Sequence, residues 1–198
     1  MQSKMHPYFN WAKERLDEMD AALGSLEAKL GDVQLDARIR AGQILAELRE
    51  KRDHFRNTVS KQTEAGEAAL VSAKEKLESE WSTFQAQVNQ YVETFAKQVE
   101  QQRATFRLQA DAQLKSWRAA AAGLNGCAME FAAERRNEVE ANVKRMIADA
   151  AAAEEKLRKL GQAGTQSWSA MMAALTETRA AFDRANQAAA DALERAAR

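Results

Sequence analysis

The sequence contains few of the residues that interrupt helices or crosslink a chain. Among its 198 residues are one proline, eight glycines and one cysteine. Because proline and glycine are the least favourable residues in a helix interior, their scarcity favours long helices over a compact mixed fold. The single cysteine, Cys127, has no second cysteine with which to form an internal disulfide, and this fits a reducing compartment.

An excess of charge of either sign is also missing. The chain has 29 basic and 29 acidic side chains, and the two signs balance within each third of the sequence. Proteins that bind nucleic acid neutralise phosphates with a surplus of lysine and arginine. We therefore expect no nucleic-acid partner.

Long apolar runs are absent as well. The first residues, 1–7, have no apolar segment of the kind that a secretory signal needs. The longest uncharged run, residues 160–176, contains two glycines and several polar residues, which makes it too short and too polar to span a bilayer. These features predict a cytoplasmic protein.

Residues that carry chemistry are scarce. The two histidines, His6 and His54, form no His-x-x-x-His or Glu-x-x-His pair for a metal site, so we interpret both as solvated side chains. Cys127 follows a glycine-rich segment near an expected helix start, but it has no basic or histidine neighbour to activate a thiolate. No glycine-rich phosphate loop or nucleophile elbow occurs. The prediction is a protein that is not an enzyme, with no catalytic residue, cofactor or metal.

A repeat of 11 residues is present in the middle of the chain, from Ser72 to Ala121. In successive units a serine or threonine precedes an aromatic residue, which gives the column Phe84, Phe95, Phe106 and Trp117. Eleven residues close almost three turns of an α-helix, so these side chains would be about 16.5 Å apart on one line of a rod.

The repeat defines an amphipathic seam. Its members are Leu77, Trp81, Phe84, Val88, Val92, Phe95, Val99, Arg103, Phe106, Leu114 and Trp117. Arg103 occupies an apolar slot, where it would either extend away from the seam or set register against a partner. Mostly neutral, hydrogen-bonding residues border the seam: Lys76, Gln87, Gln98 and Gln109 on one border, with Ser72, Thr83, Thr94, Thr105 and Ser116 just outside it. Another helix can approach such a border without desolvating an ion.

Similar periodicity predicts helices elsewhere. Pro7 suits a first helical turn, and a heptad stripe runs from Phe9 to Val33 before it continues in phase toward the repeat. The expected helical stretches are about 7–62, 67–122, 127–160 and 165–197, in a single elongated domain of residues 1–198. Within 33–122 the candidate breaks are near Gly31 and in the polar segment 60–66.

Glycine, asparagine and capping residues predict where the last two helices begin and end. Two glycines and an asparagine in 123–126 predict a chain reversal there, with Cys127 at its tip. The next helix should end at Gly161, after the i,i+4 pairs Glu154 with Arg158 and Glu155 with Lys159, and Thr165 should cap the final helix. Trp168, Met171 and Met172 form either ordinary core or an adaptable binding patch.

Together these patterns predict an all-α fold, an extended antiparallel long-helix bundle or coiled coil with an 11-residue repeat. Either residues 32–122 form one rod, or the chain bends near 60–66 and makes a bundle of three rods. We favour the bundle, because a lone helical pair leaves half of each apolar stripe in water.

The repeat in Ser72 to Ala121 resembles that of exchangeable apolipoproteins, and the alanine- and glutamine-rich character resembles that of bacterial phasins on polymer granules. Apolipoprotein repeats are punctuated by proline, whereas no proline follows Pro7 here. The residues themselves favour a non-enzymatic interaction or structural protein that self-associates or binds partner helices through the seam. The resemblance implies the alternative, reversible coating of a lipid or polymer-granule surface.

Overall fold

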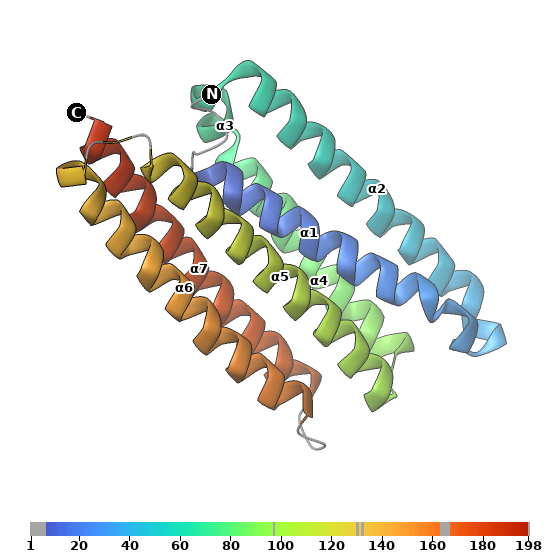
Figure 1. Ribbon diagram of the computed structural model, residues 1–198. Helices are drawn as coiled ribbons and strands as arrows, with labels where there is room; N and C mark the ends of the chain where they lie inside the picture. Colours follow the sequence, from blue (N-terminus) through green and yellow to red (C-terminus); the bar gives the residue numbers. More distant parts are fainter. Residues whose placement is uncertain (1–6, 97, 130, 132, 163–166, 198) are drawn as a thin grey trace. The chain divides into compact units, whose positions relative to one another are not determined.

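The chain is all-helical in a computed structural model, which describes residues 7–96, 98–129, 131, 133–162 and 167–197 (Figure 1). About 94% of the described residues are helical, and they contain no strand. The helices are α1 (Pro7–Ala28), α2 (Leu35–Ala65), α3 (Glu67–Ser72), α4 (Lys74–Phe95), α5 (Val99–Ala128), α6 (Ala133–Gln162) and α7 (Trp168–Ala197), with a 3-10 turn at Leu30–Asp32 after α1. The predicted all-α class is therefore confirmed, and an antiparallel helical bundle fits it.

The helices belong to two compact units. One unit comprises residues 1–14 and 113–198, and the other comprises residues 15–112. The first, which we call the terminal unit, contains the start of α1, the end of α5, and α6 and α7. The second, which we call the central unit, contains the rest of α1, α2, α3, α4 and the start of α5. The single elongated domain of residues 1–198 stays a prediction.

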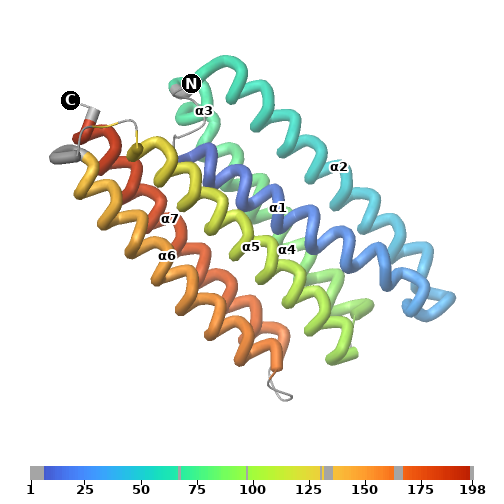
Figure 2. Tube along the Cα trace, in the orientation of Figure 1, coloured from blue at the N-terminus to red at the C-terminus, as the bar shows by residue number. Residues whose placement is uncertain are grey.

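The central unit is a set of antiparallel helices. The chain reverses after α1 at the turn Leu30–Asp32, so that α2 returns beside α1 (Figure 2). Between α1 and α2, Arg52 and Arg56 both bind the carboxylate of Asp20. Leu48, Phe55, Leu77 and Phe84 are completely buried in this unit. The candidate break near Gly31 is thus a real one, and the predicted helix 7–62 is two helices.

The polar segment 60–66 is helical up to its last residue. α2 continues to Ala65, and Gly66 ends it with φ 104° and ψ 177°. Only glycine adopts this backbone conformation without strain. The predicted break is therefore confined to Gly66, whose positive φ ends the helix.

The predicted helix 67–122 is wrong, because the chain breaks it between α4 and α5. Ala96, with φ −108° and ψ 51°, ends α4, and α5 starts at Val99. The chain reverses there, so α4 and the start of α5 lie antiparallel (Figure 1). The longest described helix, α2, has 31 residues, so neither the 32–122 rod nor the bundle of three long rods is formed.

The chain reversal predicted at residues 123–126 is also wrong. α5 continues through both glycines to Ala128, and neither Gly123 nor Gly126 has positive φ. Leu124 and Ala128 are buried, which extends the apolar stripe of Trp117 and Ala121 through the glycines. Cys127 therefore lies inside the last turn of α5 and not at the tip of a turn.

The last two helices form an antiparallel hairpin in the terminal unit (Figure 1). α6 begins at Ala133 rather than at residue 127, and it passes Gly161 to end at Gln162. The proposed cap Thr165 lies outside the described residues. Trp168, Met171 and Met172 are buried near the start of α7, so they belong to the core.

Candidate functional site

The predicted seam does not follow one rod. Leu77 to Phe95 lie on α4 and Val99 to Trp117 lie on α5, so the helix break between Phe95 and Val99 divides the aromatic column in half. Leu77 to Phe106 fall in the central unit, whereas Leu114 and Trp117 fall in the terminal unit. The 11-residue repeat is therefore not the period of a single continuous helix.

Most of the seam is buried in the folded chain. Leu77, Phe84, Val88, Val92, Phe106 and Trp117 have no exposed surface, and Leu114 has 5%. The exceptions are Trp81, Phe95 and Arg103, which are half-buried, and Val99, which is 47% exposed. The seam therefore supplies core for the chain's own helices.

Aromatic contacts show how the seam is enclosed. In the central unit the rings of Trp81 and Phe84 stack with centroids 6.2 Å apart, and the Arg15 guanidinium from α1 lies 5.6 Å from the Trp81 centroid. In the terminal unit Trp117 contacts Phe182 of α7 edge to face at 5.5 Å. Edge-to-face and cation–π contacts add directional stabilisation to apolar burial.

Arg103 lies partly buried on α5. Its Nη1 is 3.1 Å from Oε1 of Glu100, three residues earlier on the same helix. The side chain is 14% exposed, as expected for an arginine that buries its stem and holds its charged end near water. A role in setting register stays a prediction.

The border residues of the seam differ in burial between α5 and α4. On α5 the border residues Thr105 and Gln109 are completely buried, and Ser116 is 4% exposed. Gln113, four residues after Gln109, was not among the predicted border residues and is completely buried as well. Thr105 Oγ1 lies 2.9 Å from Ser25 Oγ of α1 in the central unit. In the terminal unit Gln113 donates to the Leu175 carbonyl at 3.2 Å and accepts from the Thr178 hydroxyl. This border therefore faces other helices.

On α4 the border faces water instead. Thr83 is exposed and donates back to the Ser79 carbonyl at 2.9 Å, within its own helix. Gln87 donates to Glu47 of α2 at 2.6 Å across an exposed edge of the central unit. The sequence pattern identified both borders, but it contained no signal that only the one on α5 is buried.

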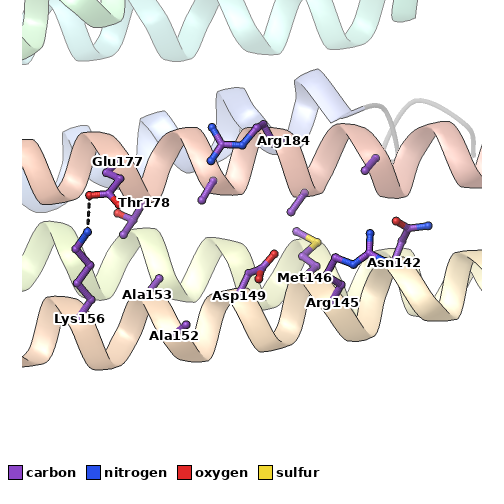
Figure 3. Close-up of a pocket in the computed structure, with 13 residues that line it drawn as sticks. Asn142, Arg145, Met146, Asp149, Ala152, Ala153, Lys156, Glu177, Thr178 and Arg184 are labelled. Carbon is purple, nitrogen blue, oxygen red and sulfur yellow. Dashed lines mark hydrogen bonds and ion pairs between the residues drawn. The ribbon is translucent and has the colours of Figure 1, made fainter.

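A surface groove of about 490 Å³ lies between α6 and α7 of the terminal unit (Figure 3). Alanines such as Ala152, Ala153 and Ala181 leave the space, and an ion pair between Lys156 and Glu177 closes one end. Asp149 points toward α7 across the groove. No histidine, cysteine or serine is among the described residues that line it.

The candidates for chemistry are isolated. His6 lies outside the described residues, and His54 is exposed, with Nε2 at 3.3 Å from Glu80 Oε1. Cys127 is a free, partly buried thiol in α5. Within the described ranges there is no group of three His, Cys, Asp or Glu residues that could hold a metal ion, and no helix has the length and apolar character needed to cross a bilayer.

Comparison with known proteins does not place the chain in a family. No family model, no curated protein sequence and no solved structure matches it.

Proposed function

We propose that the protein is a non-enzymatic helical interaction protein, whose amphipathic helices pack against one another within the chain and whose copies self-associate. The observation that carries this proposal is the buried neutral border of α5, where Thr105 bonds Ser25 and Gln113 bonds Thr178. A surface held for lipid needs apolar area and a basic border, whereas these hydrogen bonds require a helix at a fixed position. The partners are then further copies of the chain or another helical protein, in the cytoplasm, without nucleic acid.

The seam itself closes inside each unit, so it reaches a partner in one of two ways. Helices from two copies can exchange the same contacts that they make within one chain, as in domain swapping. Alternatively, the seam stays closed and association uses an exposed helix face. In both cases the association depends on helices that keep their fold.

A second candidate function is reversible coating of a lipid or polymer-granule surface after the units open. The favourable observation is that several buried polar atoms on the seam helices have no hydrogen-bond partner among the described residues: both amide atoms of Gln109, Nε2 of Gln101 and the Tyr91 hydroxyl. Each buried polar group without a partner costs about 1–3 kcal/mol. Such groups make the closed state easier to open.

Phe106→Ala separates the two functions. The ring is completely buried, so its loss should lower the free energy of unfolding by about 3–5 kcal/mol if neighbouring helices enclose it. The measurements are the melting temperature, the oligomer size by light scattering and the binding of phospholipid vesicles. The self-association proposal expects an early melt, a changed oligomer size and no strong vesicle binding by the parent chain.

The matched control is Leu108→Ala, two residues away on α5. This side chain is 46% exposed, so its truncation should cost no more than about 1 kcal/mol. An unchanged melt of Phe106→Ala together with lost vesicle binding would favour the coating function instead.

A further inference from the structure

The reversal between α4 and α5 is held differently from the turn after α1 and from the end of α2. At the turn after α1, the Arg38 guanidinium donates to the Gly31 carbonyl at 2.7 Å. The end of α2 is fixed by the positive φ of Gly66. Between α4 and α5 there is no glycine, and no side chain of the described residues bonds the backbone of Ala96 or Gln98. This reversal is therefore kept by the packing of the two helices alone.

The backbone on both sides of this reversal already has the hydrogen bonds of a continuous helix. The Ala96 N–H donates to the Val92 carbonyl at 3.0 Å, and the Gln102 N–H donates to the Gln98 carbonyl at 3.1 Å, each four residues back. The sequence between the helices, Ala96, Lys97 and Gln98, which we call the link, consists of good helix formers. Straightening the link therefore requires a change at few residues, and Ala96, with φ −108° and ψ 51°, is one of them.

The apolar repeat is compatible with a straightened link. Phe84, Phe95, Phe106 and Trp117 recur every 11 residues on both sides of it. A single helix from Lys74 to Ala128 would hold these four side chains on one line, because 11 residues close almost three turns. The joined helix therefore keeps the apolar faces of α4 and α5 on the same side.

In the closed chain, hydrogen bonds join residues before the link to residues after it. In the central unit Thr105 Oγ1 of α5 lies 2.9 Å from Ser25 Oγ of α1. In the terminal unit the Asn10 amide of α1 donates to the Asn186 side chain of α7 at 2.9 Å. A lone chain whose link straightened would lose both bonds, so the joined helix needs something that replaces them.

We propose that the chain self-associates by exchange across this link. In the dimer, α4 and α5 of each copy join into one helix, and residues 99–198 of each copy pack on residues 7–96 of the other. Each contact between the two parts of the chain then forms between copies instead of within one, so the exchange keeps them all. The inference rests on the proposed function, since it names the helices through which the copies associate.

The surface that α5 leaves selects a second copy as the occupant. This surface presents the Ser25 hydroxyl to Thr105 and encloses the whole Phe106 side chain. An unrelated helix would leave the hydroxyl without its partner or the space of the ring unfilled, and both cost stability. The α5 helix of another copy supplies both groups at the required spacing. Short links between packed elements are where such exchange occurs.

The first test is Val99→Pro in the full chain, with the dimer dissociation constant measured by sedimentation. Val99 is the first residue of α5, where proline is favoured, and it is 47% exposed, so the closed chain should keep its circular dichroism and melting temperature. In the joined helix the same position is interior, where proline removes a hydrogen bond and clashes with the preceding turn. The dimer should therefore weaken at least about a hundredfold.

The matched control is Leu35→Pro, which places proline at the first residue of another helix. Leu35 is 78% exposed and starts α2, and Gln34 before it has the ψ of 142° that a residue before proline prefers. No straightening at this position is part of the exchange. The control should leave both the fold and the dimer unchanged.

The second test follows the exchange by a disulfide, with both chains in a Cys127→Ser background. One chain carries Ser25→Cys and the other carries Thr105→Cys, and both positions are buried, so they meet only through packed helices. The two chains are refolded together from denaturant and mildly oxidised, which should link one chain of each kind. The same pair with Val99→Pro in both chains should stay unlinked.

The third test measures the link with spin labels at Thr83 and Asp111, which are exposed positions on α4 and α5. In the closed chain both lie equally far back from the reversal on antiparallel helices, so only the sideways spacing of the helices separates them (Figure 1). One joined helix would separate them by about 42 Å. Labelled chains refolded with an excess of unlabelled chains report the distance within one copy, which should reach this value in the dimer.

The outcomes distinguish this exchange from the function on which it rests. If the parent chain dimerises while Val99→Pro dimerises equally well and the two cysteine chains do not link, the exchange is wrong and self-association stands through another surface. If the parent chain remains a monomer at every concentration, self-association itself is wrong, and the exchange with it.

Discussion

At the scale of residues, the central feature is a core that includes many polar side chains. Thr105, Gln113 and Thr178 are buried yet bonded across helices, so they stabilise one relative position of those helices. A purely apolar stripe would permit neighbouring helices to slide by a turn at little cost, whereas a displaced Gln113 would lose its partners. We interpret these residues as determinants of register within each unit.

Tyr91 differs from these hydrogen-bonded residues, because its buried hydroxyl has no partner among the described residues. Replacing it with phenylalanine removes that unsatisfied group and keeps the ring contact with Phe95, whose centroid is 5.3 Å away. Tyr91→Phe should therefore leave the free energy of unfolding unchanged or raise it by about 1–2 kcal/mol. Denaturant unfolding at neutral pH measures this, and a clear destabilisation would show that the hydroxyl has a bonded partner.

The same residue predicts an alkaline response. Burial raises the pKa of Tyr91 above its ordinary value of 10.0. Above about pH 10 the unfolded chain loses this proton while the folded chain keeps it, so stability should fall as pH rises from there toward the folded pKa. The chain has two tyrosines, so the difference in tyrosinate absorbance between the parent and Tyr91→Phe isolates this titration. The variant should show less alkaline destabilisation than the parent.

At the scale of elements, glycine has opposite roles in α2 and α5. Gly66 ends α2 with φ 104°, whereas Gly123 and Gly126 lie inside α5 without positive φ. Glycine and asparagine content alone predicts a break at all of them, and this prediction is wrong for Gly123 and Gly126. The signal that could have corrected it is the stripe Trp117, Ala121, Leu124 and Ala128, whose helical spacing passes through both glycines.

This difference predicts that alanine substitutions at these glycines have opposite effects on stability. Gly123→Ala and Gly126→Ala should each stabilise the chain by about 0.5–1 kcal/mol, because alanine is the better helix residue and a Cβ at either position meets nothing within 4 Å. Gly66→Ala should destabilise it by about 1–3 kcal/mol, because its backbone conformation strains any residue with a Cβ. Melting temperatures of the three variants check both signs. A loss of stability in Gly123→Ala would instead support the chain reversal that the sequence predicts at residues 123–126.

The break between α4 and α5 has no local signal of this kind. Ala96 and Gln98 are good helix formers, and no glycine or proline is near. The reversal lets the stripes of two helices in the central unit be buried instead of lying along one exposed rod. Such a break arises from tertiary packing, which single-chain periodicity does not contain.

At the scale of the whole molecule, the same reasoning explains what periodicity could and could not predict. Each helix needs one buried stripe whether the chain continues straight or turns back, so the apolar spacing stays in phase across the reversals at Leu30–Asp32 and after Phe95. The all-α class, most seam residues and the neutral border follow from spacing alone. The reversals, and therefore which face is enclosed and which is exposed, depend on long-range packing. For this reason the burial of the seam was predictable, whereas the exposure of Leu35 and Ile39 on α2 was not.

The balance between helix packing and surface coating leads to a last prediction for the intact chain. About 94% of the described residues are helical without any added surface, and Trp11, Trp117 and Trp168 are buried. A protein whose helices form on a lipid surface gains helix content and moves its tryptophans into an apolar environment on binding. Adding phospholipid vesicles to this chain should therefore change neither the far-ultraviolet circular dichroism nor the tryptophan emission. If the parent chain gains helix or shifts its emission as the vesicles are added, its units open on lipid, and the coating function would take precedence over self-association.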